Sequence, residues 1–195
     1  EQARKSSIFT ATLNCPWDGH HLFFTDTPGY ADFVGEAAAA IRVSDMVVIV
    51  VDAAAGIGPG TLNAWRYARD HNIPRAFFIT GMDREHADFE EILGALQNSY
   101  GATVVVPFTV PVGAKSDLSA VASVLQSEGA PAELSDMLDK YREALMDTVA
   151  ESDEELMMRY LEGEELTPEE IAAGLHEAIR TAAIVPVFAG STSKD

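Results

Sequence analysis

Residues 46–51 read Met-Val-Val-Ile-Val-Val, and residues 76–79 read Ala-Phe-Phe-Ile. Each run is apolar at every position, which is typical of a strand that is covered on both faces in a parallel sheet. Helical periodicity flanks both runs, and a third strand pattern follows at residues 184–188. This alternation of strands and helices predicts an α/β, doubly wound fold with a mostly parallel sheet.

Two more strands are expected near the start of the chain, at residues 8–14 and 22–25. Because an Asp-Gly turn lies between them, they are predicted to form a hairpin. The chain opens directly into this hairpin, as if in the middle of a domain. We therefore expect the sequence to be an excised fragment.

The composition changes after about Pro107. Residues 130–180 hold 15 acidic and 4 basic residues. An amphipathic stripe between Leu134 and Leu145, and a capping box formed by Thr167 and Glu170, predict helices there. We expect residues 107–183 to be an acidic, mainly helical subdomain, inserted into an α/β domain made of residues 1–106 and 184–195.

The charge excludes some partners. With 13 Lys and Arg against 31 Asp and Glu, the net charge is −18. Phosphate backbones and anionic membranes attract clustered basic residues, so we expect no independent DNA binding and no membrane association. Cys15 is the only cysteine, which rules out an internal disulfide and favours a reducing, cytoplasmic location.

The strongest local motif is Asp26-Thr27-Pro28-Gly29, which comes directly after a predicted strand. In nucleotide-hydrolysing switch proteins, such a carboxylate reaches Mg²⁺ through water. The glycine N–H then contacts the γ-phosphate without a side chain in the way. An ordinary Pro-Gly turn that begins with Asp explains the same tetrapeptide equally well.

Two weaker motifs follow other predicted strands. The carboxylate in Thr80-Gly81-Met82-Asp83 could accept both hydrogen bonds from the edge of guanine, and the small residues of Gly190-Ser191-Thr192-Ser193 would let amides approach a base. Taken singly, each fits an unremarkable loop. Together with Asp26 they follow strands of one parallel sheet, whose carboxyl ends are where such sheets bind ligands.

In combination, the motifs resemble the GTP-binding domain of translational GTPases, most closely elongation factor G and its paralogues. Residues 26–33 are similar to the family's D-T-P-G-H-V-D-F, 51–57 to V-D-A-x-x-G-V and 78–84 to F-V-N-K-M-D-R. Residues 160–165 resemble part of that family's helical insertion, and 185–191 its P-V-F-x-G-S-A. The resemblance covers nearly the whole chain, in order.

This resemblance implies roles for particular residues. It makes the fold a nucleoside-triphosphatase domain of the P-loop type, with GTP or GDP and Mg²⁺ as cofactors. Asp26 would contact Mg²⁺ through water. Ser7 would be a ligand of Mg²⁺, because residues 1–8 resemble the end of the family's first switch. The nucleotide-contacting residues would be Asp26, Gly29, Thr80, Gly81, Asp83, Ser191 and Thr192.

The sequence departs from the family at three places. No G-x-x-x-x-G-K-[ST] occurs in the chain, so the first strand and phosphate loop are expected upstream, and the chain alone is expected to be inactive. Tyr30 takes the position of the family's catalytic His, and a phenol cannot replace an imidazole in that mechanism. Thr80 and Gly81 replace the Asn and Lys of N-K-x-D, which predicts weaker binding that still favours guanine.

The resemblance also implies partners. In elongation factor G the insertion contacts the stalk protein of the large ribosomal subunit, and an acidic row on the insertion could steer a basic partner. The row is Asp136, Asp139, Glu143 and Asp147. The predicted function is therefore GTP-dependent translocation on the ribosome. A ribosomal-protection or release-factor-type GTPase, or a degenerate paralogue that binds ribosomes without hydrolysing GTP, remains an alternative.

Overall fold

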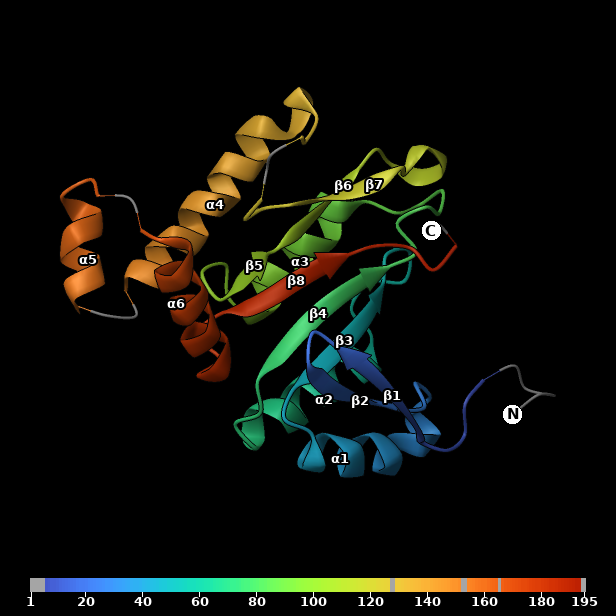
Figure 1. Ribbon diagram of the computed structural model, residues 1–195. Helices are drawn as coiled ribbons and strands as arrows, with labels where there is room; N and C mark the ends of the chain where they lie inside the picture. The colour runs from blue at the N-terminus through green and yellow to red at the C-terminus, as the bar shows by residue number, and fades with distance from the viewer. Residues whose placement is uncertain (1–5, 127–128, 152–153, 165, 194–195) are drawn as a thin grey trace.

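The computed structural model describes residues 6–126, 129–151, 154–164 and 166–193 (Figure 1). Its centre is a four-stranded sheet in the order β3-β4-β8-β5. The strands are β3 (Val47–Asp52), β4 (Arg75–Thr80), β8 (Val185–Ala189) and β5 (Val105–Pro107). All three pairings are parallel, which confirms the predicted α/β fold.

Strand β4 lies inside the sheet and carries the centre of the core. Phe77 and Ile79 on this strand are fully buried. The Phe77 ring stacks with Trp65 of α2 (Pro59–Asp70) and with Tyr100 of α3 (Phe89–Tyr100). The stack fixes both helices against the sheet, so the loops that leave its strands start from a rigid base.

Strand β3 is buried on only one side, contrary to the prediction. Ile49 and Val51 are buried, but Val48 is 53% exposed and Val50 is 60% exposed. Val48 and Val50 lie on the same face of the sheet, and the described part of the chain leaves that face of β3 uncovered. β3 also ends the strand order, so it has one hydrogen-bonded neighbour and one unpaired edge among the described residues. An apolar run therefore indicated a strand, but not its position in the sheet.

The predicted hairpin is present, with shifted bounds. Strands β1 (Ala11–Trp17) and β2 (His20–Asp26) are antiparallel, and Asp18 and Gly19 form the turn with φ of 44° and 75°. This two-residue turn pairs Trp17 with His20, so the first strand includes Pro16 and begins after the predicted Ile8. Every residue of the hairpin is exposed.

Among the described residues between β5 and β8, the structure has a second hairpin and three α-helices. The hairpin is β6 (Thr109–Val112) with β7 (Ala120–Ser123), which the sequence analysis did not predict. The helices are α4 (Ser135–Ala150), α5 (Glu154–Leu161) and α6 (Pro168–Arg180). Short helical turns lie at Lys115–Asp117 and Ala132–Leu134.

The predicted stripe and caps of these helices are confirmed. Leu138, Tyr141 and Leu145 on α4 are buried in the same cluster as the sheet residues. Thr167 Oγ1 accepts the Glu170 N–H at 3.3 Å and completes the capping box of α6. The segment therefore shares one core with the parallel sheet.

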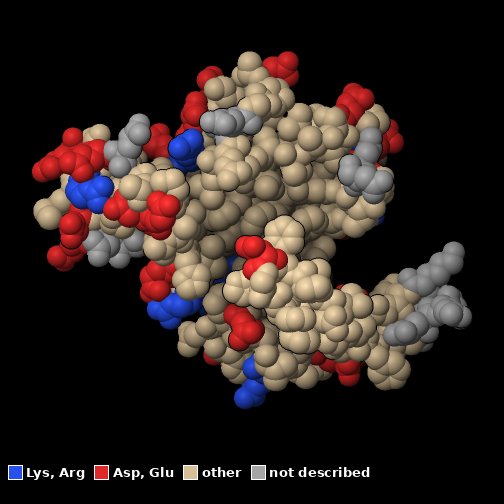
Figure 2. Space-filling view, viewed as in Figure 1, with Lys and Arg blue, Asp and Glu red and all other residues tan. Residues whose placement is uncertain are grey.

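Figure 2 shows acidic side chains gathered over the lobe at the left, where Figure 1 places α5 and the adjoining helices. The four residues of the acidic row all lie exposed on α4. Among the described residues, no helix is both long and apolar enough to cross a membrane.

Candidate functional site

The loops at the carboxyl ends of β3, β4 and β8 are joined by backbone hydrogen bonds. Ala53 N donates to Thr80 O at 2.9 Å, and Gly190 N donates to Ile79 O at 2.9 Å. Met82 N donates to Gly190 O at 3.3 Å. Figure 2 shows the surface hollowed on its right side, towards which β4 and β8 run in Figure 1. This edge of the sheet is where a parallel α/β fold binds a ligand.

Two predicted base-binding residues meet directly at this edge. Ser191 Oγ donates to Asp83 Oδ1 at 2.5 Å, and Ser193 N donates to Ser191 Oγ at 3.0 Å. The hydrogen bond from Ser191 is the main reason that the pKa of Asp83 lies below its usual range. Asp83 is therefore a charged acceptor, held in place from the neighbouring strand's loop.

Thr80 and Gly81 take part through their backbones. Thr80 O receives the bond from Ala53, and Gly81 O receives one from Arg84 N at 3.1 Å. Gly81 is buried and has φ of +74°, a conformation that suits glycine. The side chain that the family has at this position is absent, and the space beside Gly81 is taken by Arg84.

Asp26 and Gly29 lie in a loop that rests on a different element. Asp26 is the last residue of β2 and is exposed, whereas Pro28 is buried. A Cβ atom placed on Gly60, in the first turn of α2, would lie 3.7 Å from Gly29 O. The loop is therefore packed against the start of α2, which follows β3 in the chain.

Ser7 lies four residues before Ala11, the residue that pairs with Asp26. The connecting segment is anchored by Thr10, whose N and Oγ1 donate to Glu36 Oε2 at 3.0 and 2.7 Å. These bonds lower the pKa of Glu36. Residues 1–5 of the predicted switch segment lie outside the described residues.

Tyr30 follows Gly29 and begins the short helical turn Ala31–Phe33, which leads into α1 (Val34–Val43). Its carbonyl accepts the Phe33 N–H at 3.0 Å, and it is 61% exposed. The phenol therefore lies at the surface of the loop that carries Asp26. Thr192, the last of the predicted contact residues, is exposed beside Ser191.

The structure adds two residues that the sequence analysis left without a role. Arg84 Nη1 forms an ion pair with Asp52 Oδ2. Asp52 Oδ1 also accepts the N–H groups of Ala54 and Ala55, at 2.9 and 3.1 Å. Both residues lie within the sequence motifs that resemble the translational GTPases. Their opposite charges, at the ends of two predicted strands, were the signal in the sequence that could have indicated this ion pair.

Asp26 and Ser7 offer oxygen ligands, which suit Mg²⁺. Within the described ranges, no group of three or more His, Cys, Asp and Glu side chains could hold a metal ion.

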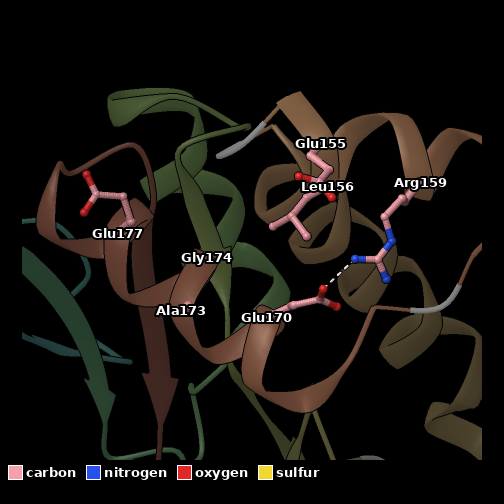
Figure 3. Close-up of a pocket in the computed structure, with 7 residues that line it drawn as sticks. All are labelled: Glu155, Leu156, Arg159, Glu170, Ala173, Gly174 and Glu177. Carbon is pink, nitrogen blue, oxygen red and sulfur yellow. Dashed lines mark hydrogen bonds and ion pairs between the residues drawn. The ribbon is translucent and has the colours of Figure 1, made fainter.

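A separate groove of about 410 Å³ lies between α5 and α6 (Figure 3). Leu156, Ala173 and Gly174 line it together with charged residues. Arg159 donates to Glu170 Oε1 at 2.6 Å and to Glu164 Oε2 at 2.9 Å. Because both helices belong to the acidic lobe, the groove is not part of the site at the strand ends.

Comparison with known proteins identifies one matching family model, described as the elongation factor Tu GTP binding domain, over residues 1–195. A crystal structure of a protein from Thermus thermophilus is 28% identical in sequence, with a TM-score of 0.88. The match covers 97% of this chain and 30% of that one. The chain therefore spans just under a third of the length of this similar structure.

Proposed function

This chain belongs to the family of elongation factor Tu GTP-binding domains, and on that premise we propose that it is the nucleotide module of an elongation-factor-G-type GTPase. In this proposal it binds GTP and GDP with Mg²⁺, acts on the ribosome in the cytoplasm, and promotes translocation in protein synthesis. Residues 107–183 form its inserted subdomain. Residues 1–106 and 184–195 form the nucleotide-binding part.

The contact between Asp83 and Ser191 is the observation that carries this proposal. A carboxylate fixed in its charged form can accept hydrogen bonds from N1–H and the 2-amino group of guanine. Adenine presents no such pair of donors. Ser191 holds the carboxylate from the loop after β8, so the acceptor is oriented before the base arrives.

Asp26, Gly29 and Ser7 would serve the phosphate end of the nucleotide. Asp26 reaches the magnesium ion through water, Ser7 offers a hydroxyl ligand, and Gly29 N–H faces the γ-phosphate. When bound, Mg²⁺ neutralises phosphate charge as it develops. The packing of Gly29 against the start of α2 supports this role, because it fixes the loop relative to the sheet.

We propose that this chain by itself binds nucleotide weakly and does not hydrolyse it. A phosphate loop supplies most of the contacts to the triphosphate in P-loop enzymes, and the 195 residues contain no such motif. The edge of β3 that is unpaired among the described residues supports this proposal, since a further strand could pair there.

Calorimetric titration with GTP, GDP and ATP in Mg²⁺ tests both statements. We expect weak binding that favours guanine, with no measurable ATP binding. Joining a strand and a phosphate loop to the chain should then bring the dissociation constant into the micromolar range. Micromolar GTP binding by the chain alone would refute the proposed inactivity, and equal binding of ATP and GTP would refute guanine recognition.

A second candidate is a paralogue that binds ribosomes without hydrolysing GTP. Tyr30 in place of the family's His, and Thr80-Gly81 in place of Asn-Lys, favour it. The two candidates are separated by measuring ribosome-stimulated GTP hydrolysis. The proteins compared are the chain joined to a strand and a phosphate loop, and the Tyr30→His variant of that chimera. Hydrolysis only after the Tyr30→His change supports the second, and hydrolysis with Tyr30 present supports the first.

The proposed protein partner is the stalk protein of the large ribosomal subunit, recognised by the acidic row on α4. Asp139 and Glu143 are exposed, and changing both to Lys should weaken association at low salt. Changing the exposed Asp45 and Asp117 to Lys alters the total charge equally and is the control. Unchanged stalk binding in the Asp139/Glu143 variant would refute this site.

A further inference from the structure

The side of the base-binding loop that Gly81 leaves without a side chain is occupied by Arg84. A Cβ atom placed on Gly81 would lie 3.1 Å from Arg84 Nε, 3.3 Å from its Cδ and 3.4 Å from its Cζ. Positive φ further disfavours any side chain at residue 81. Arg84 therefore occupies the space beside residue 81, and a side chain at residue 81 would require Arg84 to shift.

Arg84 is fixed at both ends. Its N–H donates to Gly81 O, and its O accepts the Ala87 N–H, each at 3.1 Å. Its guanidinium pairs with Asp52 Oδ2, while the other Asp52 oxygen is held by Ala54 N and Ala55 N. The side chain therefore links the loop after β4 to the loop after β3 and remains 58% exposed.

We propose that Arg84 is a positioning residue for the purine: its flat guanidinium and stem cover one face of the base, and Asp52 holds them there. This inference rests on the proposed guanine-binding function. Guanidinium groups stack on ring faces as well as pairing with carboxylates. Arg84 thereby supplies both a cover for the base and a link between loops, which Thr80 and Gly81 do not.

Weak nucleoside binding by the chain itself can be measured by NMR titration with guanosine and inosine. Arg84→Ala should weaken both equally, by roughly threefold to tenfold, because a contact with the ring face does not sense the 2-amino group. Arg84→Lys keeps a stem and a cation but loses the flat guanidinium, so it should recover only part of the affinity lost in Arg84→Ala. Asp52→Asn retains an oxygen that can accept the N–H groups of Ala54 and Ala55. It removes the charge that pairs with Arg84, so it should weaken the binding of both nucleosides.

Two controls distinguish this inference from the function on which it rests. Asp83→Ala should reduce guanosine binding more than inosine binding, because only guanosine has the 2-amino group. Arg69→Ala removes an arginine paired with Asp70 on α2 and should change neither affinity. Amide hydrogen exchange at Met82 and Asp83 should accelerate in Arg84→Ala, even without ligand.

The outcomes are distinct. If Asp83→Ala weakens guanosine binding but Arg84→Ala and Asp52→Asn do not, the inference is wrong and the proposed function stands. A change in the guanosine-to-inosine ratio in Arg84→Ala would also overturn it, because Arg84 would then act only by displacing Asp83. If the wild-type chain binds neither nucleoside, the proposed function and the base contact both fail.

Discussion

The proposed role of Asp83 depends on a neighbour that is distant in sequence. The Ser191 hydroxyl holds the carboxylate and lowers its pKa. Because the folded-state pKa is depressed, the carboxylate remains charged at pH values where an unperturbed aspartate begins to protonate. Base recognition through Asp83 should therefore persist into mildly acidic conditions.

Changing Asp83 to Asn should switch the preferred base. The Asn amide would place an N–H donor opposite the 2-amino group of guanine, which is also a donor. Xanthine has a carbonyl oxygen in place of that amino group, so it can accept the hydrogen bond from the amide. We expect guanosine affinity to fall roughly 100-fold, since two charge-assisted hydrogen bonds are lost, and xanthosine affinity to rise. Competition titration measures both, and unchanged guanosine binding would contradict the assignment.

At the residue scale, the sequence indicated the proposed binding residues but not the contacts that hold them. Asp83 and Ser191 were found because each directly follows a strand pattern. The pairing of Arg84 with Asp52 was not predicted, because it depends on the register that sets Asp52 beside Thr80. Register between parallel strands is a tertiary property, which no local motif encodes.

At the scale of elements, the start of α6 is a small ionic network. Glu170 accepts from Thr167 N at 2.8 Å, from its Oγ1 at 3.0 Å and from Arg159 at 2.6 Å. The bond from the Thr167 backbone is the largest of the causes that lower the pKa of Glu170 to about 2. The network therefore ties α5 to the first turn of α6.

Glu170→Gln should lower the melting temperature at pH 7 by a few degrees, roughly the effect of losing one cap. Since the folded-state pKa is depressed from 4.5 to about 2, the contribution is complete above pH 4.5 and is lost as the pH falls towards 2. The difference between wild type and variant in thermal unfolding should shrink over that range. Glu169→Gln is the control, and a constant difference would contradict the argument.

Tyr141 is the polar link between α4 and α3. It is buried, and its hydroxyl donates to Glu90 Oε1 at 3.2 Å. Burial, followed by the nearby Glu90 charge, raises the pKa of Tyr141 to about 12.

Tyr141→Phe should reduce the free energy of unfolding by about 1–2 kcal/mol, because it leaves Glu90 without this donor. Denaturant unfolding measures the loss, with the exposed Tyr30→Phe as control. Equal stability of Tyr141→Phe and wild type would show that Glu90 is satisfied by water instead.

Elements were predicted unevenly, for physical reasons. Caps and amphipathic stripes depend on neighbouring residues, so α4 and α6 were found. The β6–β7 hairpin has strands of only four residues each, one containing Pro111, and such strands lack a clear period. The apolar run of β3 was interpreted as fully buried because composition does not reveal whether another element covers the second face of the strand.

At the scale of the whole molecule, apolar surface is concentrated on the β1–β2 hairpin and on β3. Leu13, Trp17 and Phe23 of the hairpin are exposed, as are Val48 and Val50. An exposed apolar edge strand is a template for pairing with another chain. The chain alone should therefore self-associate as its concentration rises.

Changing Val48 and Val50 to Lys should suppress that association without unfolding the chain, because both side chains are already exposed. Sedimentation velocity over a concentration series measures it. The control is Val121→Lys, at an exposed position on β7. Association that persists in the double variant would locate the contact elsewhere, for example on the hairpin.

The strand order also has a consequence for how the protein is made. β8 lies between β4 and β5, yet all the residues from Phe108 to Ile184 are synthesised between β5 and β8. During translation, β4 and β5 must wait as separate edges while the second hairpin and three helices emerge. The nascent chain can close its sheet only when β8 leaves the exit tunnel, so a pause in synthesis before that point would prolong its exposure to chaperones and to aggregation.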